Sequence, residues 1–166
     1  MIGHSQQAFE HTVRAFSADL YRFAYWLCRD RHLSEDLVQE TYLRAWKSWG
    51  ELRDPAQAKA WLFTILRNER FREHGRRRAQ PLEETPEWAL PSIPSFEAGL
   101  ETGQIVALLP ETYREPLLLQ VLGGFSCAEI ATMLGTTEGA VMTRLTRARQ
   151  ALRRDFAEPS RKRAKL

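Results

Sequence analysis

Short polar and basic side chains line one side of a segment near the C-terminal end of the chain. At about 100° per residue, Met142, Thr143, Thr146 and Arg147 fall on the same face of a helix that Thr137 can cap. Short side chains can reach base edges in a DNA major groove, and arginine binds phosphate. This pattern favours nucleic-acid recognition over catalysis.

The same face belongs to a predicted helix-turn-helix. The segment 126–149, SCAEIATMLGTTEGAVMTRLTRAR, begins with the capping-box pair Ser126 and Glu129, and Gly135 ends its first helix. A plain helical hairpin is the alternative interpretation. The arginines that follow the turn are opposed by a single nearby acid, Asp155, whereas a purely structural surface helix usually mixes both charges. The charge pattern therefore favours the DNA-binding interpretation.

Catalytic and metal-binding patterns are absent from the sequence. The 4 histidines are scattered, the 2 cysteines lie far apart, and no phosphate-binding glycine motif or nucleophile motif occurs. The adjacent carboxylates Glu83 and Glu84 lie in a proline-rich segment without a predicted cleft. We therefore expect no enzyme, no catalytic residue, no metal and no cofactor. A small nuclease is the only enzymatic alternative.

The charges of the chain are segregated along the sequence. The net charge is only +3, but arginines concentrate in residues 67–78 and basic residues again in 144–165, with an acidic stretch between them. Such a distribution predicts two separate contacts with a polyanion. No apolar run approaches the roughly 20 residues that span a bilayer, and the N-terminus lacks a secretory pattern. We expect a cytoplasmic protein without membrane insertion.

Helical periodicity and proline spacing predict an all-α protein with two small helical domains. The first domain covers residues 1–79 and the second, with the helix-turn-helix, covers 97–157. A flexible, proline-rich acidic linker, 80–96, joins them, because prolines at this spacing leave no room for a helix. The basic tail, 158–166, is expected to be irregular beyond Pro159.

In the first domain, three amphipathic helices are predicted. They cover residues 8–28, a segment from Ser34 to about Trp49, and a segment that Asp54 caps and Pro55 begins. The second helix carries a polar face interrupted by Leu43, which indicates a docking surface. The third helix runs into the arginine-rich stretch. In the second domain, Pro116 requires either a late start or a kink of the helix that contains it.

Aromatic residues beside the arginines of the third helix have two interpretations. Trp61, Phe63 and Phe71 could stack on unpaired bases while the guanidinium groups bind phosphates. Alternatively, all three rings lie in the core, which is the preferred interpretation for Trp61.

Several of these segments together resemble the extracytoplasmic-function (ECF) sigma factors of bacterial RNA polymerase, a group of the sigma-70 family. SEDLVQETYLRAW is similar to their second conserved region, and WLFTILRNERFREHGRRR is similar to the helix that follows it. LPETYREPLLLQVLGGFSCAEIATMLGTTEGAVMTRLTRAR is similar to their C-terminal domain. The resemblance runs from about Phe9 to Leu152. It departs from the family at Arg72, where an aspartate is usual, and at Met142 and Thr143, where a basic residue and a serine are common.

The resemblance implies a role for each group of residues. The contacts with the clamp helices of the largest polymerase subunit would come from Asp36, Gln39, Glu40, Leu43 and Arg44. The minus-10 promoter element would be bound by Leu52, Arg53, Asn68, Arg72, Arg76 and Arg77. The loop around Leu52 would capture a flipped base, and Asn68 with the arginines after it would hold the duplex edge and the non-template strand. The minus-35 element would be read by Thr137, Met142, Thr143, Thr146 and Arg147.

The resemblance also implies partners. They are bacterial core RNA polymerase, promoter DNA and an anti-sigma factor that would wedge between the domains of a monomer. The acidic linker would follow the RNA exit path. A dimeric helix-turn-helix repressor that acts without polymerase is the alternative, although neither a dimerisation helix nor a ligand pocket is visible in the sequence.

Overall fold

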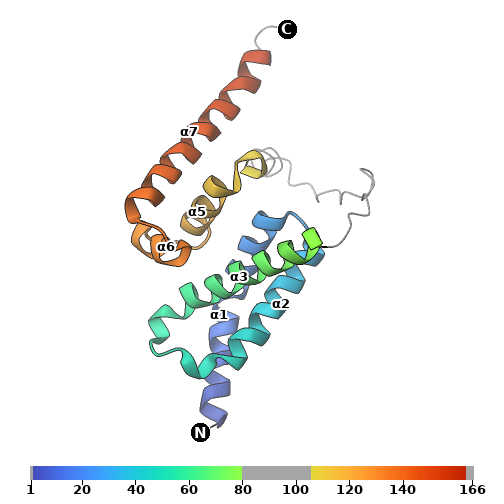
Figure 1. The fold of residues 1–166 in the computed structure, drawn as a ribbon, viewed down its shortest axis with the longest axis vertical. Coiled ribbons are helices and arrows are strands. Elements are labelled where there is room, and N and C mark those ends of the chain that lie inside the picture. Colours follow the sequence, from blue (N-terminus) through green and yellow to red (C-terminus); the bar gives the residue numbers. More distant parts are fainter. Residues whose placement is uncertain (1, 80–105, 164–166) are drawn as a thin grey trace. The chain divides into compact units, whose positions relative to one another are not determined.

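The computed structural model describes the backbone of residues 2–79 and 106–163, and the side chains of residues 5–73, 75 and 106–154. Throughout these ranges the chain forms helices and turns and no strand (Figure 1). It divides into two compact units, one before and one after the segment 80–105. The predicted all-α class with two helical domains is thus confirmed. The predicted linker, 80–96, lies outside the described residues.

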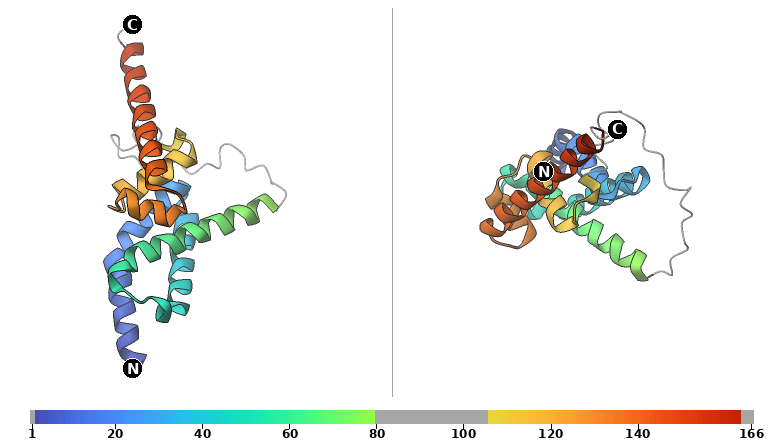
Figure 2. Two further views of the ribbon diagram at one scale, coloured as in Figure 1. Left: turned by 60° about the vertical axis from the view of Figure 1, so that its left-hand side comes forward. Right: turned by 90° about the horizontal axis from the view of Figure 1, so that it is seen from above.

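Unit 1 is a bundle of three helices. α1 covers Ile2–Cys28, α2 covers Arg31–Lys47 and α3 covers Ala58–Ala79. α2 packs against both other helices, and α1 also contacts α3. Their apolar stripes meet in a core whose fully buried members are Leu20, Phe23, Ala24, Ala45, Leu62, Phe63 and Leu66. The C-terminal half of α3 extends beyond the bundle, as the left-hand view of Figure 2 shows.

The predicted start of α2 at Ser34 is wrong by about one turn. Asp30 is the N-cap, because its Oδ1 accepts a hydrogen bond from the backbone N–H of Leu33 at 2.9 Å. Ser34 is instead fully buried inside the helix, where its hydroxyl donates to the carbonyl of Asp30 at 2.6 Å. Both residue types suit an N-cap. The tertiary fold selects Asp30 because Ser34 faces the core.

Two short 3-10 helices connect α2 to α3. They are η1, Trp49–Glu51, and η2, Pro55–Gln57. Asp54 caps η2 as predicted, since its Oδ1 accepts from the backbone N–H of Ala56 at 2.9 Å. Residues 52–54 between the two 3-10 helices form an irregular loop.

Unit 2 contains the helix-turn-helix. After one helical turn at 106–108 come α5, Glu111–Val121, α6, Cys127–Leu134, and α7, Glu138–Arg163. α7 contacts both α5 and α6. Pro116 lies inside α5 and is buried, so the helix does not start late. The core of unit 2 includes Leu117, Leu118, Leu119, Phe125, Ile130, Ala131, Val141, Leu145 and Ala148.

The predicted end of regular structure at Pro159 is wrong. α7 continues through Pro159 to Arg163. A proline removes one backbone N–H and costs about 3 kcal/mol inside a helix. The flanking stretches of alanine, arginine, glutamate and lysine are strong helix formers and favour the helix on both sides.

Candidate nucleic-acid interface

Capping interactions fix both ends of α6 and the start of α7. Ser126 and Glu129 form the predicted capping box, in which each side chain bonds the other residue's backbone N–H at 3.2 Å. α6 ends at Gly135, whose φ of 64° lies in the left-handed region. This conformation is strained for a residue with a side chain and is unstrained for glycine. Thr137 caps α7, because its Oγ1 accepts from the backbone N–H of Ala140 at 3.1 Å. The direction in which α7 leaves the turn is therefore set locally.

α7 presents the predicted base-reading face to solvent. Val141, Leu145 and Ala148 are buried against α5 and α6, which leaves the other side of the helix open. Met142 is 56% exposed. The other exposed members of this face are Thr143, Thr146, Arg147 and Gln150. The structure thus brings together the residues that the resemblance assigns to the minus-35 element, with Thr137 at the start of the helix.

The two threonine hydroxyls on this face are bonded to the helix itself. The Thr143 hydroxyl donates to the carbonyl of Gly139 at 3.0 Å, and the Thr146 hydroxyl donates to the carbonyl of Met142 at 2.9 Å. Such bonds to the preceding turn are common for threonine in helices. Their protons are therefore already used in the free protein.

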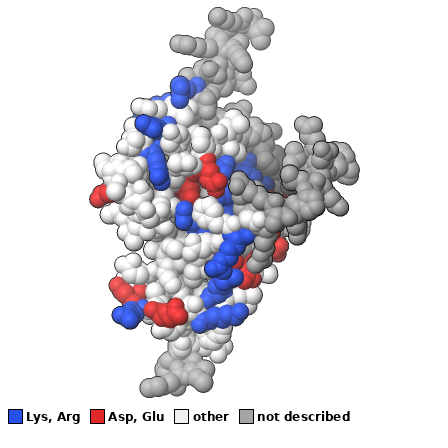
Figure 3. Space-filling model, viewed as in Figure 1, with Lys and Arg blue, Asp and Glu red and all other residues white. Residues whose placement is uncertain are grey.

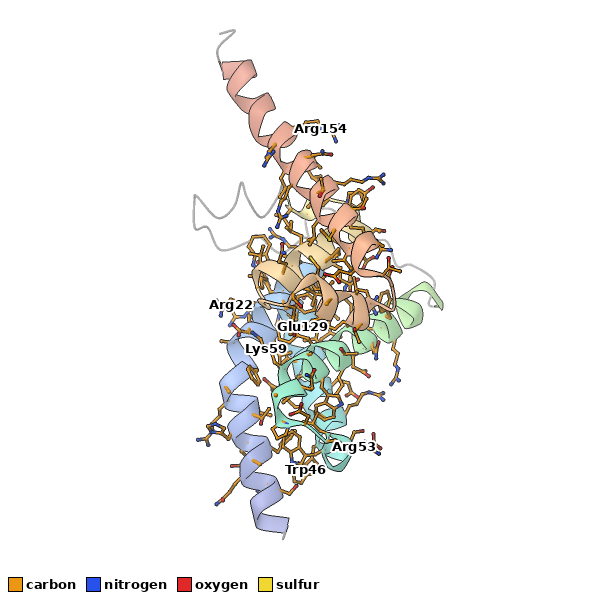
Figure 4. All side chains as sticks on the ribbon, turned by 90° about the vertical axis from the view of Figure 1, so that its left-hand side faces the viewer. Arg22, Trp46, Arg53, Lys59, Glu129 and Arg154 are labelled. Atoms are coloured by element: carbon orange, nitrogen blue, oxygen red, sulfur yellow. The ribbon has the colours of Figure 1, made fainter. Side chains whose placement is uncertain are left out.

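The arginines of α7 divide into two groups. Arg149 donates to the side-chain amide of Gln120 on α5, so this arginine ties two helices together. Arg147, Arg153 and Arg154 are exposed. In Figure 3, blue Lys and Arg side chains follow α7 and, separately, lie over α3. Figure 4 shows the labelled Arg154 on the part of α7 beyond the turn. Arg149 is exposed as well, so among the arginines that follow the turn it has a structural contact in addition to an accessible side chain.

In unit 1 the polar face of α2 is exposed as predicted. Asp36, Gln39 and Glu40 are exposed, and Leu43 exposes 57% of its surface among them. Arg44, the fifth member of the predicted polymerase-binding set, lies further towards α3 and is only half-exposed. The first four residues therefore share one exposed face of α2.

Glu69 joins this face to the arginine-rich part of α3 and is not among the predicted site residues. The Glu69 side chain is only 5% exposed, yet its carboxylate pairs with Arg44 of α2 and with Arg72 one turn along α3, the latter at 3.2 Å. Arg44 also contacts Glu40 at 3.4 Å. A signal was available, because Glu69 and Arg72 have the (i, i+3) spacing of a helical ion pair. Nothing in the sequence indicated the cross-helix partner.

Beside this ion-pair network lies a cavity of about 270 Å³. Asn68 and Arg72, both assigned to the minus-10 element, line it together with Arg44. The other lining residues are Lys47, Ser48, Glu51, Trp61, Ile65 and Glu69. The cavity thus combines an amide and three cations with two carboxylates and two apolar side chains.

The remaining residues assigned to the minus-10 element lie on the loop and at the end of α3. Leu52 is half-buried and Arg53 is exposed. Figure 4 shows Arg53 and Trp46 at the end of unit 1 where α2 gives way to this loop. Arg76 and Arg77 lie on α3, but their side chains are outside the described set.

The three aromatic rings of α3 have different environments. Phe63 is fully buried against Phe23, with ring centroids 5.1 Å apart. Trp61 is half-buried and contacts Trp49. Phe71 is 46% exposed, and the Arg67 guanidinium lies 4.7 Å from its ring centroid. Phe71 is thus the most exposed of the three rings, although Arg67 covers part of it, and the stacking interpretation is wrong for the buried Phe63.

Burial also perturbs a titratable group on the inner side of α2. Desolvation raises the pKa of the Tyr42 phenol above its ordinary value of 10.0, and a hydrogen bond with Ser17 of α1 opposes this shift. The phenol therefore stays neutral over the physiological pH range. Within the described side chains, no group of three or more His, Cys, Asp or Glu residues could hold a metal ion.

Comparisons with known proteins agree with this arrangement. The family described as "Sigma-70 region 2" matches residues 12–80, and "Sigma-70, region 4" matches residues 100–152. The ECF RNA polymerase sigma factor SigL of Mycobacterium tuberculosis is 36% identical over 86% of this chain and 85% of its own length. The ECF RNA polymerase sigma factor EcfG of Rhodopseudomonas palustris is 37% identical over 84% of this chain and 80% of its own length. A probable RNA polymerase sigma factor, RfaY of Xanthomonas campestris, is 33% identical, but the chain spans only 41% of it.

Two solved structures share the fold. The sigma factor RpoE, in its complex with the anti-sigma factor NepR from Bartonella quintana, is 28% identical with a TM-score of 0.74, over 90% of this chain and 96% of RpoE. CnrH, in its complex with the cytosolic domain of CnrY, is 26% identical with a TM-score of 0.68, over 92% of this chain and 90% of the other. No helix within 2–79 or 106–163 is long and apolar enough to cross a membrane.

Both sigma-70 regions are thus present in their family order, and relatives of similar length match along most of the chain. The chain belongs to the sigma-70 family, as an ECF RNA polymerase sigma factor.

Proposed function

We propose that this chain binds bacterial core RNA polymerase, recognises the minus-35 and minus-10 elements of its promoters, melts the DNA and starts transcription of a specific set of genes. The observation that carries the proposal is the exposure of both functional faces on rigid helices. The polar face of α2 and the outer face of α7 are free in the two units that match sigma-70 regions 2 and 4.

The polymerase contact is assigned to the face of α2 formed by Asp36, Gln39, Glu40 and Leu43. It combines carboxylates and an amide with one exposed leucine, which suits a partner helix with basic residues and an apolar site. Arg44 supports this face from one side, because it holds the Glu40 carboxylate at 3.4 Å. Its contribution to docking would then be partly indirect.

The minus-10 contact is assigned to the loop with Leu52 and Arg53 and to the arginine-rich side of α3. Unstacking a base costs a few kcal/mol, which capture of the base and contacts with phosphates can offset. The cavity beside Asn68 and Arg72 lies next to this loop through Glu51, and its lining offers apolar and cationic groups beside the carboxylates of Glu51 and Glu69. DNA melting is therefore a consequence of binding, and we propose that the chain has no catalytic activity of its own.

The minus-35 contact is assigned to the N-terminal half of α7. Met142, Thr143, Thr146 and Arg147 would lie in the major groove, where a helix of this size fits. Thr137 caps the helix and would hold its N-terminus towards a phosphate, which the helix dipole favours.

The partners follow from the family. Core polymerase and promoter DNA are required for the activity, and an anti-sigma factor would hold the monomer inactive, as NepR is bound to RpoE in the related complex. We place the protein where polymerase and chromosome are found, in the bacterial cytoplasm. The promoter sequence does not transfer from relatives, because Met142 and Thr143 differ from the residues common at these positions.

Run-off transcription tests the proposal. Core polymerase is incubated with a bacterial genomic fragment library, with and without this protein, and new start sites are mapped. We expect new starts that share two spaced sequence motifs. If the folded protein binds duplex DNA by itself and yields no new start, the sigma assignment fails and the dimeric repressor takes its place.

A double substitution locates the polymerase contact. Gln39→Ala with Glu40→Ala should abolish most run-off product and weaken binding to core polymerase, because two central polar contacts are lost. The matched control is Gln6→Ala with Glu10→Ala, a glutamine–glutamate pair on α1 that is also exposed, with an internal hydrogen bond of 3.0 Å. Equal losses in both double variants would remove the α2 face from the proposal.

A further inference from the structure

We infer that α7 selects its DNA site mainly through thymine methyl groups. The reading surface would be an apolar strip formed by the Met142 side chain and the methyl groups of Thr143 and Thr146. This inference rests on the proposed function, since it names the chemical group that the minus-35 interface recognises. It goes beyond that function because it assigns base selectivity to contacts without hydrogen bonds.

The threonine hydroxyls provide the first argument. Each donates its only proton to the carbonyl four residues earlier on α7, at 3.0 Å for Thr143 and 2.9 Å for Thr146. A hydroxyl held in this way faces the preceding turn of the helix, so the methyl group on the same carbon is left on the solvent side. Two residues that look polar in the sequence therefore present methyl groups to a ligand.

Met142 provides the second argument. Its side chain is 56% exposed on the same face, with a buried neighbour, Val141, on one side and Thr143 on the other. Thr146 lies one turn further along, so the three side chains form one strip along the helix. A thioether cannot donate a hydrogen bond and accepts one only weakly. Met142 and the two bonded threonine hydroxyls thus offer no proton to a base, and the threonine oxygens can only accept.

The major groove contains one apolar group, the 5-methyl of thymine. All other groups that bases present there are hydrogen-bond donors or acceptors, and burying these against methyl groups would leave them unpaired. Thymine is therefore the base that fits the strip, and the other bases are disfavoured by desolvation. Arg147 lies next to the strip and retains five donors for phosphate or guanine.

Deoxyuridine tests the inference, because it differs from thymine only by the missing methyl group. Once run-off mapping has defined a minus-35 element, each of its thymines on either strand is replaced singly by deoxyuridine. Competition binding of the complete holoenzyme then gives the relative Kd. We expect at least two positions at which binding weakens about fourfold, the effect of removing one buried methyl group. An element without thymine, or full tolerance of deoxyuridine, overturns the inference.

Paired substitutions separate the methyl group from the hydroxyl. Thr143→Val and Thr146→Val keep the methyl group, and both should stay sensitive to deoxyuridine at the same positions as the wild type. Thr143→Ser and Thr146→Ser keep the hydroxyl, and each should bind about fourfold more weakly and lose sensitivity to deoxyuridine at one position. Far-UV circular dichroism confirms that the variants fold. The reverse result, with serine active and valine inactive, would show that the hydroxyls read the bases.

Different outcomes contradict the proposed function and the reading of thymine methyl groups. If the unmodified promoter gives no start with the wild-type protein and core polymerase, the proposed function itself fails. If start sites are selected normally and deoxyuridine has no effect, only the methyl-reading inference fails.

Discussion

Arg44 and Arg72 share one buried carboxylate, although the resemblance assigns them to different partners. Glu69 is 5% exposed and pairs with both, whereas the side chains of Arg44 and Arg72 are 37% and 52% exposed. The three residues thus form a network in which the anion is buried and the cations reach solvent. Removing the anion and removing the cations should have unequal effects, because a charge left alone in the interior is costly and one left in water is not.

This asymmetry gives a prediction on stability. Glu69→Gln should lower the free energy of unfolding by no more than about 1 kcal/mol, since the arginines that lose their partner remain hydrated. The double variant Arg44→Met, Arg72→Met leaves the buried carboxylate unpaired and should cost about 3–5 kcal/mol. Urea denaturation of the free protein measures both values.

A control excludes a general effect of removing arginines. Arg31→Met with Arg22→Met removes two exposed arginines that form ion pairs with Glu35 and Asp19, and should change stability by less than about 1 kcal/mol. If Glu69→Gln were as damaging as the double arginine variant, the explanation based on the buried carboxylate would be wrong.

At the scale of elements, the short connections between α5 and α6 and between α6 and α7 determine the position of α7. The chain turns between α5 and α6, which contact each other, and Gly123 lies at this turn. A Cβ added at Gly123 would lie 2.5 Å from the ring of Phe125 and 2.6 Å from the carbonyl oxygen of Leu119. Phe125 is buried and its backbone N–H bonds that same carbonyl at 3.3 Å, so neither group can move away easily.

Gly123→Ala should therefore destabilise unit 2 by about 1–3 kcal/mol through overpacking. Gly139→Ala is the matched control, because its Cβ would meet nothing within 4 Å and Gly139 lies inside α7. Replacing glycine by alanine in a helix is neutral or stabilises by up to about 1 kcal/mol. Thermal unfolding of the free protein gives the change in Tm for each variant. Equal Tm values for the two variants would contradict the packing argument.

At the scale of the whole molecule, each unit has its own core. Leu66 in unit 1 and Leu145 in unit 2 are exposed by 0% and 2%, among side chains of their own unit. Separate cores allow each unit to unfold by itself, so a single free energy of unfolding need not describe the chain. Each unit can therefore present the contacts for its own partner independently of the other unit.

Leu66→Ala should cost unit 1 about 2–5 kcal/mol, and Leu145→Ala should cost unit 2 a similar amount. Amide hydrogen exchange followed by mass spectrometry resolves the two units. We expect Leu66→Ala to accelerate exchange in α1–α3 and leave α5–α7 unchanged, and Leu145→Ala to do the reverse. Acceleration of both units by either substitution would show that they unfold together.

Much of the architecture follows from the sequence alone, because its determinants are local. The capping box at Ser126, the left-handed Gly135 and the stripe through Val141 and Leu145 depend on neighbours within two helical turns, and the structure has all of them. The exposed polar face of α2 was predictable for the same reason. Its assignment to polymerase, like the DNA assignments, stays a prediction.

The tertiary structure decided whatever depends on contacts between helices. It placed Asp30 rather than Ser34 at the start of α2, buried Phe63 against Phe23, and brought Arg44 to Glu69. For the start of α2 the sequence offered two residues suited to an N-cap, for Phe63 it allowed either a buried or an exposed ring, and for Glu69 it gave no sign of a partner on another helix. The choice was made by burial against a helix that is distant in sequence, which local periodicity cannot specify.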